Sequence, residues 1–321
     1  MDHRPAQGSA AARGALTRLR RLLPRELHDT DRPSATAQAV TLYRALELRR
    51  PGVQRIVSDP FAPLFLTAGT RALLRPLALA TPLRDLAAQH DLGGLSTYVL
   101  CRHRFLDAHL ERALDDGTEQ VLILGAGYDS RAYRFATELA GRPVYEVDLP
   151  PLSQRKATIV AAHPARFGVG AITRVEIDFR TQTLPDRLDA AGFVRGRRTF
   201  VVWEGVAPYL DSAAVDATLS ALESLCGAGS TLALDLWDGT GGPGPLAPLR
   251  RLGAHAIALI GEPVTFGVAP SAVSELLGAH RFGVVDLANA AELTDRYATA
   301  GRQSFESLYV VAAELLPVPN R

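Results

Sequence analysis

Acidic side chains follow four apolar segments of the chain, each at the point where the segment ends. They are Asp129, Asp148, Asp178 and Glu204. If the segments are neighbouring parallel strands, their carboxyl ends meet at one edge of a sheet, where open α/β proteins bind ligands. Carboxylates there accept hydrogen bonds from hydroxyl and amino groups and attract positive charge. The pattern predicts a site for a polar, partly cationic ligand, although each acid alone is also compatible with an ordinary loop.

Glycines precede the first of these acids. Gly125, Ala126 and Gly127 directly follow the apolar run at 121–124, and such a turn lets the backbone approach a nucleotide-like ligand closely. The motif alone is weak, because a tight strand-to-helix turn uses the same glycines. Asp148 lies about 20 residues further on, where a carboxylate is expected to accept hydrogen bonds from ribose hydroxyls.

A third glycine, which dinucleotide-binding loops use, is missing here. Asp129 and Arg131 occupy that region instead. Asp129 would repel a pyrophosphate but would suit the ammonium group of a bound amino acid. S-adenosylmethionine has a ribose, an amino-acid end and a sulfonium but no phosphate, so these residues favour it as the cofactor over a nicotinamide dinucleotide.

The remaining two acids complete the predicted cofactor site. Asp178 would accept the adenine amino group, with Phe179 against the adenine ring. Glu204 follows the fourth apolar run and would join the other acids at this edge. The alternatives are that Asp178 caps a turn and that Glu204 is a solvated charge at the end of a strand.

Composition excludes several other classes of function. The chain has 321 residues, is 47% hydrophobic and 21% charged, and carries a formal net charge of +1. That balance gives no electrostatic reason to expect a nucleic acid or a membrane surface as partner. The two cysteines, Cys101 and Cys226, are expected to be buried free thiols. The eight histidines show no metal-ligand spacing, so no metal is expected.

Periodicity divides the chain into five parts. Residues 1–32 are expected to be a mobile tail without the apolar core of a signal peptide, so a cytoplasmic protein is predicted. The single domain at 33–321 then has four consecutive parts: helices at 33–115, a cofactor-binding core at 116–237, an inserted helical lid at 238–270, and terminal strands at 271–321. The glycines of the insertion, at 239–244, suggest a hinge.

Strands and helices alternate within the predicted core, which indicates a doubly wound α/β fold. Strands are expected at 121–124, 144–147, 172–177, 199–203 and 231–236, and a terminal pair at 282–287 and 307–313. Helices are expected at 95–114, 131–140, 150–162, 183–191 and 211–225, and another near Asp59 and Pro60. Together these elements predict a mostly parallel, Rossmann-like seven-stranded sheet.

Several of these segments also carry a family resemblance. The strings LGAGYDSRAYRF (124–135), EVDLP (146–150) and WEGVAPYL (203–210) resemble the leucine carboxyl methyltransferase family. Upstream, SATAQAVTLYRA (34–45) and SDPFA (58–62) are similar to its bacterial branch, which includes polyketide-tailoring carboxyl methyltransferases. The resemblance spans about residues 34–315. It implies a class I methyltransferase fold, S-adenosylmethionine as cofactor, and methyl transfer to oxygen.

The resemblance also assigns roles to residues. It implies that Arg102 contacts the cofactor carboxylate, with Arg104 as a rival in a neighbouring register, and that Leu149 adjoins the cofactor. A helix-face arginine exposed to solvent is the alternative for Arg102. Tyr209 is a candidate to orient the acceptor, although it could simply be a packed aromatic. His103 lies beside Arg102, but a structural role is the more common one for such a histidine.

One departure from the family bears on the acceptor. Members that methylate a phosphatase use a lysine in the N-terminal helix, whereas Lys156 is the single lysine here. A small-molecule acceptor, methylated on a carboxylate or a hydroxyl during natural-product tailoring, is therefore expected. Three alternatives stay open: a protein C-terminal carboxylate as acceptor, a nicotinamide-dependent oxidoreductase, and a binding protein without turnover. The oligomeric state is not predicted.

Overall fold

The computed structural model describes residues 35–72, 94–168, 170–179, 181–238, 264–299 and 301–318. The tail predicted at 1–32, and residues 239–263 of the predicted lid with its expected hinge, lie outside the described residues. Within the described residues, no helix is both long enough and apolar enough to span a membrane.

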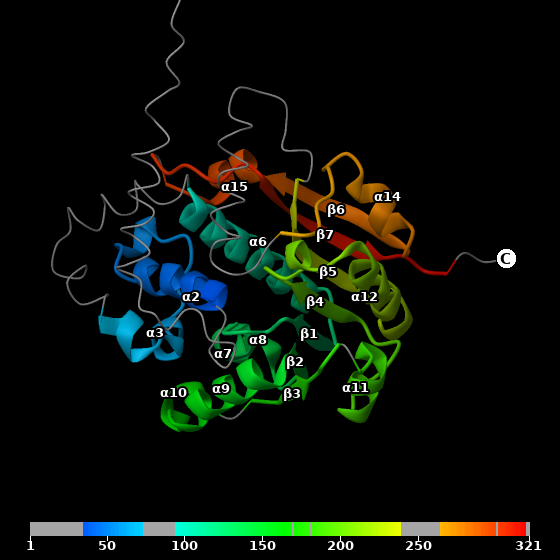
Figure 1. The fold of residues 1–321 in the computed structure, drawn as a ribbon, viewed down its shortest axis with the longest axis horizontal. Helices are drawn as coiled ribbons and strands as arrows, with labels where there is room; N and C mark the ends of the chain where they lie inside the picture. Colours follow the sequence, from blue (N-terminus) through cyan, green and yellow to red (C-terminus); the bar gives the residue numbers. More distant parts are fainter. Residues whose placement is uncertain are drawn as a thin grey trace, which may run out of the picture.

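A seven-stranded sheet forms the centre of the molecule (Figure 1). Its strands are β1 (Gln120–Leu124), β2 (Val144–Asp148), β3 (Ile172–Glu176), β4 (Thr199–Trp203), β5 (Thr231–Trp237), β6 (Phe282–Asn289) and β7 (Leu308–Leu315). They lie in the order β3-β2-β1-β4-β5-β7-β6, with β1 to β5 parallel and β7 antiparallel to both β5 and β6. The predicted mostly parallel sheet with a terminal antiparallel pair is confirmed.

The sheet is buried on both faces, which explains why its strands are apolar throughout rather than alternating with polar residues. In β4, Phe200 and Val202 enter one hydrophobic cluster, whereas Val201 and Trp203 enter the cluster on the opposite face. The other central strands divide their side chains in the same way. An acid inside such a strand therefore has to face one of the two helical layers.

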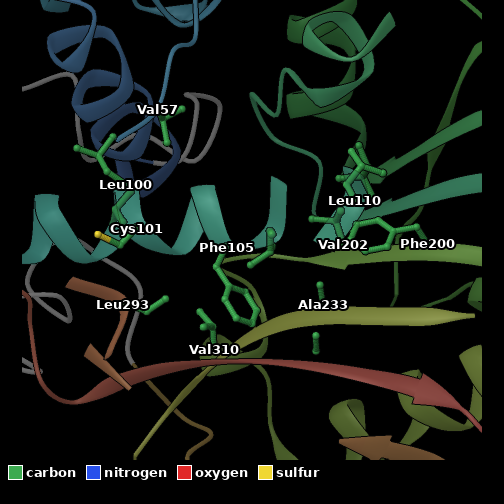
Figure 2. Close-up of a cluster of buried hydrophobic side chains, with 14 of the residues drawn as sticks. Val57, Leu100, Cys101, Phe105, Leu110, Phe200, Val202, Ala233, Leu293 and Val310 are labelled. Carbon is green, nitrogen blue, oxygen red and sulfur yellow. The ribbon is translucent and has the colours of Figure 1, made fainter. Parts of the chain in front are cut away.

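Helix α6 (Leu95–Asp115) covers one face of the sheet. Phe105 points from the helix toward the strands, beside Val310, whereas Leu100 lies on the other side of the helix, toward Val57 (Figure 2). Three polar residues of α6, Arg102, His103 and Asp107, are also buried. A helix that buries charged side chains against a sheet must supply partners for them.

The other elements complete the two layers. On the α6 side lie α7 (Arg131–Arg134), α8 (Ala136–Leu139), α9 (Pro150–Ala161), α10 (Pro164–Phe167) and α15 (Ala290–Tyr297). Helices α11 (Leu184–Ala190), α12 (Ser212–Leu225) and α14 (Val273–Gly278) cover the opposite face. The N-terminal part adds α2 (Ala35–Glu47), η2 (Gly52–Gln54) and α3 (Ala62–Phe65), and η3 (Ala207–Tyr209) follows β4.

Two predicted helices differ in the structure. The helix expected at 131–140 is broken at Phe135, where the backbone leaves the helical region, so α7 and α8 are each one turn long. The helix expected to start near Asp59 and Pro60 starts instead at Ala62, with Pro63 in its first turn. Asp59 precedes the cap residue Phe61, and its carboxylate accepts the backbone N–H groups of Phe61 (3.0 Å) and Ala62 (3.1 Å).

Candidate active site

A cavity of about 1060 Å³ opens at the carboxyl ends of β1 and β4. This is the point where the order of the sheet reverses, since β2 lies on one side of β1 and β4 on the other. Ligands of doubly wound sheets bind at this switch point. The wall contains ten of the eleven residues that the sequence predicted: Arg102, Gly125, Ala126, Gly127, Asp129, Asp148, Leu149, Phe179, Glu204 and Tyr209.

The glycine loop after β1 has the backbone shape that its sequence predicts. Gly125 and Gly127 both have positive φ, +63° and +40°, a region that costs other residues free energy. At Gly125 a side chain has no space either, because a Cβ would overlap with Cγ2 of Val206. The loop therefore presents bare backbone to the cavity.

Asp148, at the end of β2, holds this loop and faces the same cavity. One carboxylate oxygen accepts the N–H of Gly127 (2.5 Å), and the other accepts the N–H of Leu149 (2.7 Å). Burial raises the pKa of the Asp148 carboxyl, and these two backbone donors partly offset that rise. Each oxygen keeps a lone pair for a ligand hydroxyl.

Two apolar side chains border the same end of the cavity. Leu149 is 53% exposed and Phe179 is 58% exposed, an unusual state for large apolar residues that line a cavity. Asp178 lies beside Phe179, just outside the cavity wall, and its contact with adenine stays a prediction. Its backbone N–H donates to the side chain of Gln182 (3.0 Å), so this segment forms a turn, as the alternative interpretation held.

Glu204 is not the solvated strand-end charge that the sequence left open, because its side chain is only 9% exposed. It accepts from Arg102 (3.0 Å) and Arg131 (2.8 Å), and contacts Nδ1 of His103 (3.1 Å). Burial alone would raise the pKa of the Glu204 carboxyl, but these cationic and donor groups hold it well below its usual range. Glu204 is therefore a fixed negative charge in the cavity wall.

Arg102 is the arginine of α6 that lines the cavity. Its guanidinium donates to Glu204 and, through NH1, to Asp235 (2.7 Å). The rival Arg104 pairs with Glu111 at a half-exposed position outside the wall. The solvated alternative for Arg102 is wrong, since the side chain is buried between two carboxylates.

Asp235 was not among the predicted site residues. It belongs to β5 and shares the α6 side of the sheet with Ala233 and Trp237, so its carboxylate meets Arg102. Its second oxygen accepts the N–H of Gly205 (2.5 Å) and thereby fixes the loop that carries Glu204. An acid inside the apolar run 231–237 was the sequence signal that could have identified it.

His103 lies between two arginines and Glu204. Its Nε2 faces Arg134 (2.9 Å), and its Nδ1 faces both Arg131 (3.0 Å) and Glu204 (3.1 Å). Because a guanidinium can only donate, both arginines disfavour a protonated ring. Burial, followed by the charge of Arg131, lowers the pKa of His103. Because both ring nitrogens are already engaged, His103 has no free site with which to remove a proton from an acceptor.

Further buried charges stand behind the cavity wall. Arg131 contacts Asp107 (2.8 Å) and both oxygens of Asp129, one through its backbone N–H and one through its guanidinium. Arg134 also donates to Asp107 (2.7 Å). Asp129 therefore faces the cavity with both carboxylate oxygens already engaged, so the ammonium contact predicted for it would have to share them.

Together these groups leave an uneven charge. Among the described residues of this cluster, four carboxyl groups oppose three guanidinium groups, and burial lowers the pKa of His103 and raises that of Asp235. The opposed groups are Asp107, Asp129, Glu204 and Asp235 against Arg102, Arg131 and Arg134. The excess negative charge lies in a buried cavity wall, where an uncompensated charge is costly. A cationic ligand would offset it.

Another part of the cavity wall, the apolar end, is lined by hydrophobic side chains. Its wall includes Val40 and Tyr43 of α2, Val99 of α6 and Trp237 of β5, together with Tyr209 of η3. Tyr209 is half-buried and packs against the hydrophobic cluster of the α6 face, so it both lines the cavity and packs as the alternative interpretation held. This end lies beside the glycine loop and the charged wall, so two ligands can occupy one continuous space.

Comparisons with known proteins agree with this arrangement. A model of the family described as leucine carboxyl methyltransferase matches residues 37–223, which include the glycine loop, Asp148 and Glu204. A Frankia alni protein, provisionally named an S-adenosyl-L-methionine-dependent methyltransferase, is 36% identical over 202 residues, covering 63% of this chain and 68% of that protein. A Mycolicibacterium paratuberculosis protein with the same provisional name is 33% identical over 248 residues, covering 74% and 77% of the two chains.

Solved structures share the fold. A crystal structure from Thermobifida fusca, provisionally described as a methyltransferase, matches with a TM-score of 0.57 at 16% identity, covering 92% of this chain and 99% of that one. A DUF574 family protein from Streptomyces avermitilis matches with a TM-score of 0.56 at 13% identity, covering 87% and 97%. At these identities the likeness concerns the fold alone.

Proposed function

The chain belongs to the leucine carboxyl methyltransferase family, and on that basis we propose that it transfers a methyl group to a carboxylate or hydroxyl oxygen of a small molecule. S-adenosylmethionine is the cofactor of this enzyme class. The observation that carries the proposal is the single cavity, which joins an acid-rich glycine loop to an apolar chamber. A cytoplasmic role in natural-product tailoring is part of the proposal.

The residues of the wall fit S-adenosylmethionine. The loop presents backbone at Gly125 and Gly127, and Asp148 offers lone pairs to ribose hydroxyls. Leu149 and Phe179 supply apolar surface for the adenine. The excess negative charge around Glu204 and Asp235 suits a cofactor that carries a sulfonium and an ammonium group, and the third donor nitrogen of Arg102 suits the cofactor carboxylate.

The cofactor supplies an electrophilic methyl group, so the protein mainly has to align the acceptor oxygen with it. Holding the acceptor oxygen about 3–3.5 Å from the methyl carbon, in line with the sulfur, is the main source of acceleration that such a site can supply. The apolar end of the cavity, which includes Val40 and Trp237, would exclude water around the acceptor. Tyr209 is placed to orient the acceptor. A carboxylate, with a pKa of about 4, needs no base, whereas a phenol, with a pKa of about 10, does. Because His103 is engaged by Arg134, the geometry favours the carboxylate.

The size of the cavity supports a small-molecule acceptor. Cavities that hold one small ligand typically measure about 300–1,000 Å³, and this one measures about 1060 Å³. It therefore has room for a small acceptor beside the cofactor. The apolar end also lacks the N-terminal lysine of the phosphatase-methylating members, which argues against a protein C-terminus as acceptor.

Calorimetric titration with S-adenosylhomocysteine tests the cofactor site directly. We expect binding by the wild-type protein, and a loss of about tenfold or more in Asp148→Ala, because the substitution removes the ribose acceptors and frees the Gly127 loop. Glu176→Ala, at the end of β3 and outside the cavity wall, is the matched acidic control. Binding of NADH in place of the homocysteine analogue would overturn the proposal.

A methyl-transfer assay tests the acceptor. Radiolabelled S-adenosylmethionine is incubated with the protein and a panel of aromatic acids and phenols, and each product is treated with mild alkali. Methyl esters release methanol under these conditions whereas aryl ethers do not, so the assay separates carboxyl from hydroxyl acceptors. Label transferred only to protein C-termini, or to no acceptor by a protein that binds the cofactor, would contradict the small-molecule proposal.

A further inference from the structure

Arg44 of α2 ties the N-terminal helices to the cofactor loop. Its side chain is 3% exposed. One terminal nitrogen donates to Asp59 (2.7 Å), and the other donates to the backbone carbonyl of Tyr128 (2.8 Å). Tyr128 directly follows Gly127, whose backbone N–H donates to Asp148. Arg44 and Asp148 therefore bind adjacent residues of the loop.

Asp59 extends the same connection to two further segments. Its Oδ2 accepts from Arg44 and from the hydroxyl of Ser130 (2.8 Å), while its Oδ1 accepts a backbone N–H at the start of α3. Ser130 also accepts from Arg134 (3.0 Å), whose guanidinium reaches Asp107 and His103. An unbroken chain of buried polar contacts therefore runs from α2 and α3 through the loop to the wall around Glu204.

We propose that Arg44 is a positioning residue for the cofactor, which fixes the loop at 125–131 in its binding shape and couples cofactor binding to the docking of α2. The proposal rests on the cofactor assignment made above. Arginine is suited to this role because its planar fork donates in two directions at once, whereas a lysine has one charged nitrogen and cannot reproduce the fork. The loop and α2 therefore stabilise each other.

The coupling has a consequence for the acceptor. Helix α2 also supplies Val40 and Tyr43 to the apolar end of the cavity. A cofactor that orders the loop would, through Arg44, hold the wall against which the acceptor packs. Linkage requires the converse as well, so disturbing the docking of α2 weakens cofactor binding by the same factor.

The test compares Arg44→Lys with the control Arg55→Lys. Arg55 also donates twice, to the carbonyls of Arg50 and Leu48 just after α2 (2.7 Å each), but it is exposed and lies outside the cavity wall. Affinity for S-adenosylhomocysteine is measured by calorimetry. Hydrogen exchange of residues 35–47 is measured by mass spectrometry with and without the same ligand.

We expect the ligand to slow exchange in α2 of the wild type and of Arg55→Lys. In Arg44→Lys we expect affinity to fall by about tenfold and the ligand-induced slowing to disappear. Ser130→Ala, which keeps every charge, is a second variant and should shift both readouts in the same direction. It also serves if Arg44→Lys fails to fold. Asn289→Ala, which removes a cap of α15 outside the cavity, controls for general destabilisation.

If Arg44→Lys and Ser130→Ala bind S-adenosylhomocysteine as tightly as the wild type, and the ligand still slows exchange in α2, the role of Arg44 is overturned. Failure of the wild type to bind the homocysteine analogue at all would instead overturn the cofactor assignment, so the two outcomes are distinguishable.

Discussion

The protonation state of His103 decides the charge of the cavity wall. Its neutral form leaves the buried cluster one negative charge in excess, and a protonated ring would cancel that excess. In a protonated ring both N–H groups would face arginine donors, Arg134 at Nε2 and Arg131 at Nδ1. The wall is thus arranged to keep the histidine uncharged and Glu204 ionised.

This arrangement predicts a specific dependence of stability on pH. The folded pKa of His103 lies below its unfolded value of about 6.5, so the unfolded state binds more protons as the pH falls below that value. The free energy of unfolding should therefore decrease below pH 6.5, by at most about 1.4 kcal/mol per pH unit for this proton. His103→Asn removes the titration, so its urea-unfolding free energy should fall less steeply between pH 7.5 and 5.5.

Arg55→Lys, which leaves every histidine in place, controls for the effect of pH on the rest of the protein. Parallel stability curves for wild type and His103→Asn would show that the ring is not held neutral.

The two glycines of the loop make a second prediction, because they differ in the space around them. Gly125→Ala combines positive φ with overlap against Val206, whereas a Cβ at Gly127 has its nearest contact at 3.8 Å. The backbone term costs about 1–2 kcal/mol at either position. Gly125→Ala should lose more stability in urea unfolding and bind S-adenosylhomocysteine more weakly. Adding Val206→Ala should recover part of the loss in Gly125→Ala and none in Gly127→Ala.

Site residues differed in how well their sequence signals predicted them. Gly125, Gly127 and Asp148 follow strand ends at fixed spacing, and the backbone alone brings them together. The contact between Asp235 and the buried Arg102 depends on which face of β5 meets α6. Because both faces of β5 are buried, the sequence pattern of the strand does not reveal that face. Asp178 had the right spacing, but its segment forms a turn outside the wall.

At the scale of elements, the strands were predicted to within about two residues because continuous apolar runs bounded by loops have few other interpretations. The helices were less certain. No glycine or proline lies at Phe135 that would have predicted the break between α7 and α8. Arg131 and Arg134 both turn inward to Asp107 there, and this tertiary contact replaces the regular helix that local propensity favours.

Helix α9 is anchored to β2 by the single lysine of the chain, which gives an element-scale prediction. Nζ of Lys156 lies 2.8 Å from Glu146, and both side chains are 2% exposed. Lys156→Met would leave Glu146 with Arg174 at 3.5 Å as its remaining cation, so we expect a loss of about 3 kcal/mol, the lower end for a broken buried pair. Urea unfolding measures it.

The double variant Lys156→Met/Glu146→Leu separates the pair from the packing around it. It should lose less stability than Lys156→Met, because no charge is then left unpaired. A double variant that is less stable than the single one would show that the ion pair is not what anchors α9.

For the whole molecule, the decisive feature is that the cavity draws its wall from every layer of the fold. Loops after β1, β2 and β4 contribute Gly127, Asp148 and Glu204, while α6 and α2 contribute Arg102 and Arg44. A ligand bound there contacts both the sheet and the N-terminal helices. We therefore expect α2 and the sheet to unfold together, as one domain over 33–321.

Scanning calorimetry tests this expectation. A single transition with equal calorimetric and van't Hoff enthalpies is predicted. S-adenosylhomocysteine at 100 times its dissociation constant should add about 2.7 kcal/mol to the stability, which raises Tm by about 5 °C for a chain of this size. Because α2 is linked to the loop through Arg44, the whole transition should move as one. Two transitions, of which the ligand shifts only the upper one, would mean that the N-terminal helices form a separate unit that contributes nothing to cofactor affinity.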